Sequence, residues 1–219
     1  MKIALPDGVI FDWDNTLVDS WSAIAEAINY VRAKYGLQTW NSTEIIENCT
    51  RSARESFPDW FGDQWEAAWA DYYAYFDIVR ARIGIHPMNG AADLLMWLYD
   101  HKIPTVVVSN KSGDYLRQES AHLGWDKFFI SIVGAHDAPR DKPAREHADH
   151  ALQLAGIKAG PAIWFVGDSE ADVACARNTD CTPVLIGTKA AAAKLKVDMV
   201  FSDCRELLGL LSDAQRAIA

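Results

Sequence analysis

Cysteine is scarce in this sequence, and long hydrophobic runs are missing. Only four cysteines stand among 219 residues, and no two of them have the close C-x-x-C spacing of a metal or redox pair. We therefore expect reduced thiols, with neither disulfides nor a zinc site. No apolar run approaches the ~20 residues that cross a bilayer, and residues 1–8 lack the apolar segment of a signal peptide. These absences favour a cytoplasmic protein with no membrane partner.

Positive charge is also in short supply. The chain has 21 Lys and Arg residues against 30 Asp and Glu residues, which gives a formal net charge of −9. No run of basic residues breaks this excess, and nucleic acids and anionic lipids bind through such cationic clusters. We therefore expect no nucleic-acid partner, and any anionic substrate needs a local positive group or a bound metal ion. A monomer and a homodimer both remain open.

What the chain does have is the composition of a folded protein. Half of the residues are hydrophobic and 23% are charged, which suits a globular core and excludes a disordered chain. At roughly 150 residues per domain, the length fits one large domain, or one domain with a smaller insert.

Residues 20–83 show helical spacing throughout. Apolar positions recur every three to four residues between Trp21 and Tyr35, and an aromatic face runs from Trp65 to Phe76. Gly84–Gly90 then breaks the pattern. Two pairs have the spacing of helix N-caps: Asn41 with Glu44, and Ser52 with Glu55.

After this break, short apolar strands alternate with helices. Runs such as Thr105–Val108 show no polar alternation, which is typical of strands covered on both faces. The alternation predicts an α/β fold with a doubly wound, Rossmann-like parallel sheet. We assign residues 1–18 and 86–219 to this core and residues 19–85 to an inserted all-helical domain. The expected strands are 9–11, 105–108, 128–133, 162–166, 182–186 and 199–201.

Polar side chains follow four of these strands. Ligands of open α/β sheets bind beyond the carboxyl ends of the strands, so we expect these side chains to converge. They are Asp12 and Asp14 after the first strand, Ser109 and Asn110 after the second, Lys142 in the loop after the third, and Asp168 and Asp172 after the fourth.

Four carboxylates in one crevice would repel each other strongly unless a cation lay among them. Oxygen ligands without His or Cys favour a hard ion, so Mg²⁺ is the expected cofactor. Lys142 could then neutralise a substrate oxyanion that the metal does not reach. Ser109 and Asn110 could donate hydrogen bonds to the same anion.

Four segments of the chain carry a family resemblance: Asp12-Trp13-Asp14-Asn15-Thr16-Leu17, Ser109-Asn110, Lys142-Pro143 and Gly167-Asp168-Ser169-Glu170-Ala171-Asp172. They resemble the four motifs of the haloacid dehalogenase superfamily, in its phosphatase branch. Their order and separations match over essentially the whole chain. The helical insert after the first motif resembles the cap of the phosphoglycolate-phosphatase-like group.

The resemblance implies a phosphomonoester hydrolase that acts on a small phosphorylated metabolite, with phosphoglycolate as the first candidate. Asp12 would be the nucleophile that forms an aspartyl-phosphate. Asp14 would be the general acid for the leaving oxygen and then the base for water. Ser109 and Lys142 would complete the catalytic set.

The resemblance also implies a ligand set for Mg²⁺ and contacts for the substrate. The Asp12 side chain, the Asp14 backbone carbonyl and the Asp168 side chain would hold the ion, and Asp172 would act through water. Substrate contacts would come from Asn110, from Lys111 and, in the helical insert, from Arg51 with Arg54 as its rival. Thr50 precedes Arg51 where related sequences often carry glycine.

Each of these residues also has a purely structural interpretation. Asp12 and Asp14 could be turn and cap residues, and Ser109 with Asn110 could cap a helix. Lys111 and Lys142 could be solvated lysines, and Asp172 could simply favour the helix dipole. The pair His147 and His150 is read as a solvated helix face.

Three other functions remain as alternatives. A phosphotransferase or sugar-phosphate mutase would use the same core but pass the phosphoryl group to a hydroxyl. A 2-haloacid dehalogenase would attack carbon without a metal, and Asp14 and the pair Asp168 and Asp172 argue against it. A non-catalytic binding module would keep only the fold.

Overall fold

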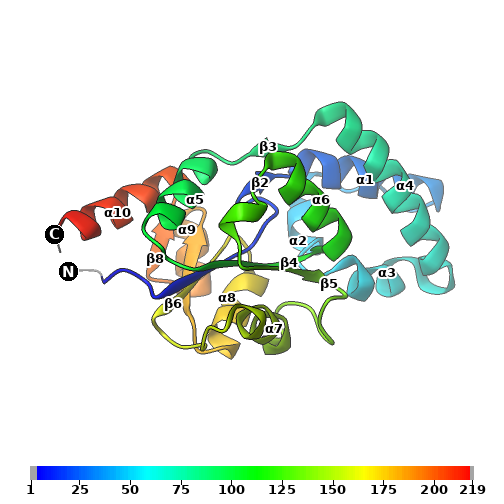
Figure 1. The fold of residues 1–219 in the computed structure, drawn as a ribbon. Helices are drawn as coiled ribbons and strands as arrows, with labels where there is room; N and C mark the ends of the chain where they lie inside the picture. The colour runs from blue at the N-terminus through cyan, green and yellow to red at the C-terminus, as the bar shows by residue number, and fades with distance from the viewer. Residues whose placement is uncertain (1–3, 218–219) are drawn as a thin grey trace. The chain divides into compact units, whose positions relative to one another are not determined.

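The computed structural model describes residues 4–217, which form two compact units (Figure 1). One unit takes in the described residues of Met1–Val18 and Pro87–Ala219, and the other is Asp19–His86. The two-residue strands β2 (Val18–Asp19) and β3 (His86–Pro87) pair where the chain passes from one unit to the other. Residues 1–3, the start of the stretch expected not to be a signal peptide, lie outside the described residues.

The first unit is built on a six-stranded sheet in the order β5-β4-β1-β6-β7-β8. Every pair of neighbouring strands in it is parallel. The prediction of a doubly wound parallel α/β fold is therefore confirmed. The strands are β1 (Gly8–Phe11), β4 (Thr105–Ser112), β5 (Ser131–Ala135), β6 (Ile163–Gly167), β7 (Thr182–Ile186) and β8 (Met199–Phe201).

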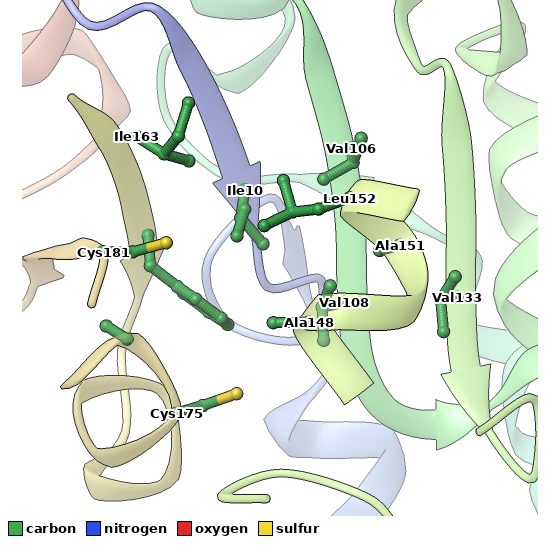
Figure 2. Packing of buried hydrophobic residues seen from close by; sticks show 12 residues of the cluster. Ile10, Val106, Val108, Val133, Ala148, Ala151, Leu152, Ile163, Cys175 and Cys181 are labelled. Atoms are coloured by element: carbon green, nitrogen blue, oxygen red, sulfur yellow. The ribbon is translucent and has the colours of Figure 1, made fainter. Parts of the chain in front are cut away.

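Two helices, α7 (Arg145–Ala155) and α8 (Glu170–Asn178), cover one face of this sheet. Figure 2 shows the core that they form with it: Ala148 and Leu152 of α7 and Cys175 of α8 point toward strand residues such as Ile10 and Val108. This dry contact buries the β-branched runs seen in the sequence, and burial of such apolar area is the main stabilising term of folding. The remaining elements of the unit are α5 (Ala91–Asp100), α6 (Gly113–Leu123), the 3₁₀ helix η2 (Asp126–Phe128), α9 (Lys189–Leu195) and α10 (Cys204–Arg216).

Two strands differ from the sequence prediction by more than one residue. Strand β4 continues through Ser112 instead of ending at Val108, and β5 spans Ser131–Ala135 instead of residues 128–133. Glycine usually weakens a strand, but here the backbones of Gly134 and Gly113 approach closely. A Cβ on Gly134 would lie 2.5 Å from the Gly113 Cα. The pairing of these two segments therefore depends on a contact that a single-strand pattern does not reveal.

The second unit is entirely helical apart from its share of β2 and β3. Asn41 caps its second helix, because its side chain accepts from the backbone N–H groups of Thr43 and Glu44. Ser52 stands at the predicted N-cap position of the third helix, but its side chain makes no capping hydrogen bond. The elements are α1 (Trp21–Lys34), α2 (Ser42–Asn48), α3 (Ala53–Phe61), the 3₁₀ helix η1 (Gly62–Gln64) and α4 (Trp65–Ile83).

Aromatic rings fill the core of this helical unit. Phe57 is 1% exposed, and its ring lies 5.1–5.7 Å, centroid to centroid, from the rings of four other side chains. Those four are Trp60, Phe61, Trp69 and Tyr72. The aromatic face predicted between residues 65 and 76 therefore contributes packing mass to this core.

Within residues 4–217, no helix combines the length and the apolar character that a membrane crossing requires.

Phe57→Ala should lower the free energy of unfolding by about 3–5 kcal/mol, because it removes a fully buried ring and leaves a cavity. Urea unfolding followed by tryptophan fluorescence measures this change. The matched control is Ile46→Ala in the same unit, whose side chain is 51% exposed and whose loss should cost only about 0.5 kcal/mol. Equal losses in the two variants would contradict the assignment of Phe57 to the core.

Candidate active site

Three carboxylates lie together at the carboxyl edge of the sheet. Asp12 follows β1, Asp168 follows β6, and Asp172 stands in the first turn of α8. One oxygen of each lies within 4.8 Å of the others. The strands explain this proximity, because Phe11 pairs with Val166 in parallel register and the Asp12 N–H donates to the Val166 carbonyl at 2.8 Å.

The ammonium group of Lys142 joins this cluster from the loop between β5 and α7. Its Nζ donates to Asp12 Oδ1 at 2.5 Å and to Asp172 Oδ1 at 2.7 Å, and the residue is 2% exposed. A buried ammonium is stable only when it is paired in this way. The interpretation of Lys142 as a solvated loop lysine is therefore wrong.

The main chain of Lys142 is held by two further side chains. Its N–H donates to Asn110 Oδ1 at 2.9 Å, and the Asn110 amide donates to its carbonyl at 3.0 Å. The same N–H also donates to His147 Nδ1 at 3.0 Å. The proton of that imidazole is therefore on Nε2, which lies 3.0 Å from the Gly134 carbonyl and donates to it.

Burial and mutual repulsion act on the protonation of the cluster. Burial raises the pKa of Asp12 to about 7, helped by the charges of Asp172 and Asp14 and opposed by Lys142. Burial, with Asp12 and Asp172, also raises the pKa of Asp168 well above its usual value. Burial alone would lower the pKa of Lys142, but the carboxylates beside it outweigh this effect and raise it. The ammonium therefore stays charged.

These carboxylates fit a hard divalent cation. The possible ligand atoms are all oxygens. The combined negative charge of Asp12, Asp168 and Asp172 exceeds the single positive charge of Lys142, which contacts two of them. Such excess negative charge in a buried site favours a cation. Burial first, and then the neighbouring carboxylates, raise the pKa values of Asp12 and Asp168, which agrees with this excess of negative charge.

Asp172 also caps the N-terminus of α8. Its Oδ2 accepts from the Ser169 N–H at 3.0 Å and from the Ser169 hydroxyl at 2.6 Å, which closes a capping box at the start of α8. Any Cβ at Gly167 would collide with the Asp172 carboxyl group. The capping role and the contact with Lys142 therefore coexist, and both fix the position of this carboxylate.

Asp14 belongs to a second, adjoining group of charges. Lys111 Nζ donates to Asp14 Oδ1 at 2.8 Å and lies 3.2 Å from Glu119 Oε1 on α6. The Lys111 side chain is only 7% exposed, so the interpretation as an exposed lysine is wrong. Asp14, the more accessible of the two aspartates after β1, faces this ammonium.

Ser109 and Asn110 lie inside β4, because that strand extends to Ser112. Ser112 occupies the N-cap position of α6, so the alternative interpretation of Ser109 and Asn110 as helix caps is wrong. Ser109 is buried, and its hydroxyl accepts from the Lys111 N–H at 3.3 Å. Asn110 directs its amide to the main chain of Lys142.

Arg51 belongs to the helical unit, between α2 and α3, whereas the residues above belong to the first unit. Its guanidinium pairs with Asp59 at 2.7 Å, and the two side chains are 45% and 61% exposed. Ion pairs with this exposure contribute little to stability.

The sequence interpretation missed two residues, Glu119 and His147. Both are buried, and the reading of His147 as part of a solvated face is wrong. A signal exists for each in hindsight. Glu119 falls on the inner face of α6 three residues after Leu116, and His147 falls beside Ala148 and Ala151 on the inner face of α7. A polar residue on the apolar face of a helix indicates a buried partner.

Comparisons with known proteins agree with this geometry. Residues 9–186 match the family model described as haloacid dehalogenase-like hydrolase. A phosphoglycolate phosphatase of Chromobacterium violaceum is 29% identical over 94% of this chain and 96% of its own length. A phosphoglycolate phosphatase of Pseudomonas savastanoi is 27% identical over 93% of this chain and 79% of its own length. A haloacid dehalogenase-like family hydrolase structure from Streptococcus pneumoniae has a TM-score of 0.79 at 22% identity, covering 94% of this chain and 97% of that one.

His147 should make the protein less stable in acid. Burial, with the nearby charge of Lys142, lowers the pKa of His147 from 6.5 to about 4. Between these values the unfolded chain binds a proton that the folded protein does not. The free energy of unfolding therefore falls as the pH falls through this window, by up to about 1.4 kcal/mol per pH unit.

The measurement is urea unfolding between pH 7 and pH 4.5, roughly the window in which the imidazole titrates, in wild type and His147→Asn. Asn keeps an acceptor near the position of Nδ1 but cannot take up the proton, so its curve should be flatter. Replacement of the exposed His122 by Asn controls for the loss of a histidine. The same pH dependence in all three proteins would show that His147 is not the group responsible.

Proposed function

The chain belongs to the haloacid dehalogenase-like hydrolase family, as a hydrolase of phosphoric monoesters, and we propose that it acts on a small phosphorylated metabolite through Asp12 with Mg²⁺ as cofactor. The observation that carries the proposal is the contact of Lys142 with Asp12 inside the acidic cluster. A nucleophilic carboxylate needs cationic neighbours before it can meet a phosphate dianion, and this arrangement supplies one.

Asp12 is assigned the attack on phosphorus. Its backbone is anchored to β6 by the bond to Val166, and its carboxylate is anchored by Lys142. Attack would form an aspartyl-phosphate and release the alcohol. Lys142 would neutralise a non-bridging phosphate oxygen, and the Ser109 hydroxyl would donate to another.

Asp14 is assigned the proton transfers. It lies two residues after Asp12, and side chains at alternate positions of an extended segment share one side. Asp14 would protonate the leaving oxygen and then take a proton from the water that hydrolyses the aspartyl-phosphate. Lys111 holds its carboxylate in place.

Mg²⁺ would be held by the side chains of Asp12 and Asp168 and by the Asp14 backbone carbonyl. Asp172 would act through a water molecule, because its oxygens already accept from Lys142 and Ser169. When bound, the ion supplies positive charge to the substrate phosphate. Asn110 is assigned to positioning Lys142 and not to substrate contact, since both ends of its amide bond that residue.

Phosphoglycolate is the first substrate candidate, because relatives over nearly the full chain carry the name phosphoglycolate phosphatase. We assign residues 19–85 the role of a cap domain. Within this domain, Arg51 is the candidate for binding a substrate carboxylate. The substrate would then replace Asp59, the exposed residue with which Arg51 now pairs. Lys111 is the corresponding candidate in the core.

Asp12→Asn should abolish hydrolysis in a screen of phosphorylated metabolites that includes 2-phosphoglycolate. The amide is a poor nucleophile, so kcat should fall by at least about 10³-fold while the thermal transition shows a folded protein. Asp198→Asn, an exposed matched change, should retain wild-type activity.

Substantial turnover by Asp12→Asn would remove Asp12 as the nucleophile. Phosphoryl transfer to an added sugar in place of water would favour the transferase alternative. Chelator-resistant halide release from a 2-haloacid would favour the dehalogenase alternative.

Mg²⁺ should raise the melting temperature of the wild-type protein after treatment with a chelator. Selective binding to the folded state contributes about 2.7 kcal/mol at a concentration of 100 times Kd. Asp168→Asn should lose this effect. It should also be more stable than the metal-free wild type, because it removes the charge of a half-buried carboxyl group that Asp12 and Asp172 repel. An equal Mg²⁺ effect in Asp168→Asn and in the Asp198→Asn control would place the ion elsewhere.

A further inference from the structure

A buried acid on α6 is unaccounted for by the proposed chemistry. Glu119 is 2% exposed. Its Oε2 accepts from the indole Nε1 of Trp13 at 2.8 Å, and its Oε1 lies 3.2 Å from Lys111 Nζ. An ionised carboxylate costs several kcal/mol to bury unless such partners compensate it. The carboxylate of Glu119 is therefore stable at this position only with both contacts. A neutral apolar side chain could fill the same space without the free-energy cost of burying a charge.

Trp13 links Glu119 to the reacting segment. It stands between Asp12 and Asp14 in the sequence and is fully buried. Its ring also meets the edges of Trp125 and Phe129, at centroid distances of 5.7 and 6.2 Å. The bond to Glu119 fixes the rotation of this ring, and with it the backbone that carries both aspartates.

Lys111 links Glu119 to Asp14. The ammonium lies between the two carboxylates, whose side chains are 3% and 18% exposed. Burial alone would lower the pKa of Lys111, but Asp14 and Glu119 outweigh this effect and raise it. The group is therefore a fixed positive charge. Because Glu119 binds it from the core, the ammonium is not drawn onto Asp14 alone.

We propose that Glu119 is a positioning residue for the phosphatase reaction: it holds Lys111 beside Asp14 and Trp13 between the two aspartates, so that the site is assembled before the substrate binds. This role rests on the proposed function. Glu119 acts through Lys111 and Trp13. Preorganised charges are effective because they need no rearrangement at the moment of reaction.

The test is a double-mutant cycle of Glu119→Gln and Lys111→Met, assayed with p-nitrophenyl phosphate and Mg²⁺. Gln keeps the shape of Glu119 and an acceptor for Trp13, but removes the charge that holds Lys111. We expect kcat to fall about tenfold, because a small displacement of the reacting groups lowers the rate by roughly this factor. KM should change less. In the Lys111→Met background the same change should lower kcat no further.

Asp114→Asn is the matched control, because Asp114 lies on the same helix with its side chain 85% exposed. It should keep the wild-type kcat. A Glu119→Gln enzyme with wild-type kcat would overturn the role. An equal loss in the two Lys111 backgrounds would overturn it too, since a merely structural effect does not depend on Lys111.

If Glu119→Gln does not fold, Glu119→Asp takes its place in the cycle. Asp keeps the charge but shortens its reach to both Lys111 and Trp13, so kcat should fall more when Lys111 is present than when Lys111 is Met. A wild-type protein that hydrolyses neither p-nitrophenyl phosphate nor 2-phosphoglycolate would defeat the proposed function and this role together. Wild-type turnover with unaffected Glu119 variants would defeat the positioning role alone.

Discussion

The shared ammonium of Lys142 is the contact on which the site depends. It can be buried only because Asp12 and Asp172 accept from it, and they can lie so close to each other only because it stands between them. The three residues come from a strand end, a loop and a helix start that are distant in sequence. The parallel sheet brings these places to one edge, as open α/β sheets generally do. Fold and chemistry therefore depend on the same ion pairs.

A fixed ammonium also requires a fixed main chain. The peptide groups of Lys142 are held by Asn110 from β4 and by His147 from α7, and His147 is held in turn by the Gly134 carbonyl. A neutral imidazole can accept at Nδ1 and donate at Nε2 at once, which no protonated imidazole can do. The burial of His147 is thus part of how Lys142 is positioned.

The sequence was most informative about features that depend on residues close together in the chain. Alternating buried strands and helices predicted the sheet, and the acidic residues after Phe11 and Val166 were placed correctly at strand ends. The failures involve partners far apart in sequence. The extra length of β4 and the later position of β5 depend on the approach of Gly113 to Gly134, and the burial of Glu119 depends on Trp13, 106 positions away. Helix periodicity places such a residue on the inner face, but only tertiary structure shows what it meets there.

Each of the two aspartates after β1 pairs with a buried lysine that a second carboxylate shares. Asp12 meets Lys142, which is shared with Asp172 in the first turn of α8; Asp14 meets Lys111, which is shared with Glu119 on α6. In each case the lysine pairs both with the aspartate after β1 and with a carboxylate on a helix, and the second contact fixes its ammonium beside that aspartate. Each trio keeps a net negative charge, and Asp168 adds another. A divalent cation would complement the first trio, and the proton transfers that we propose for Asp14 would take place beside the second trio.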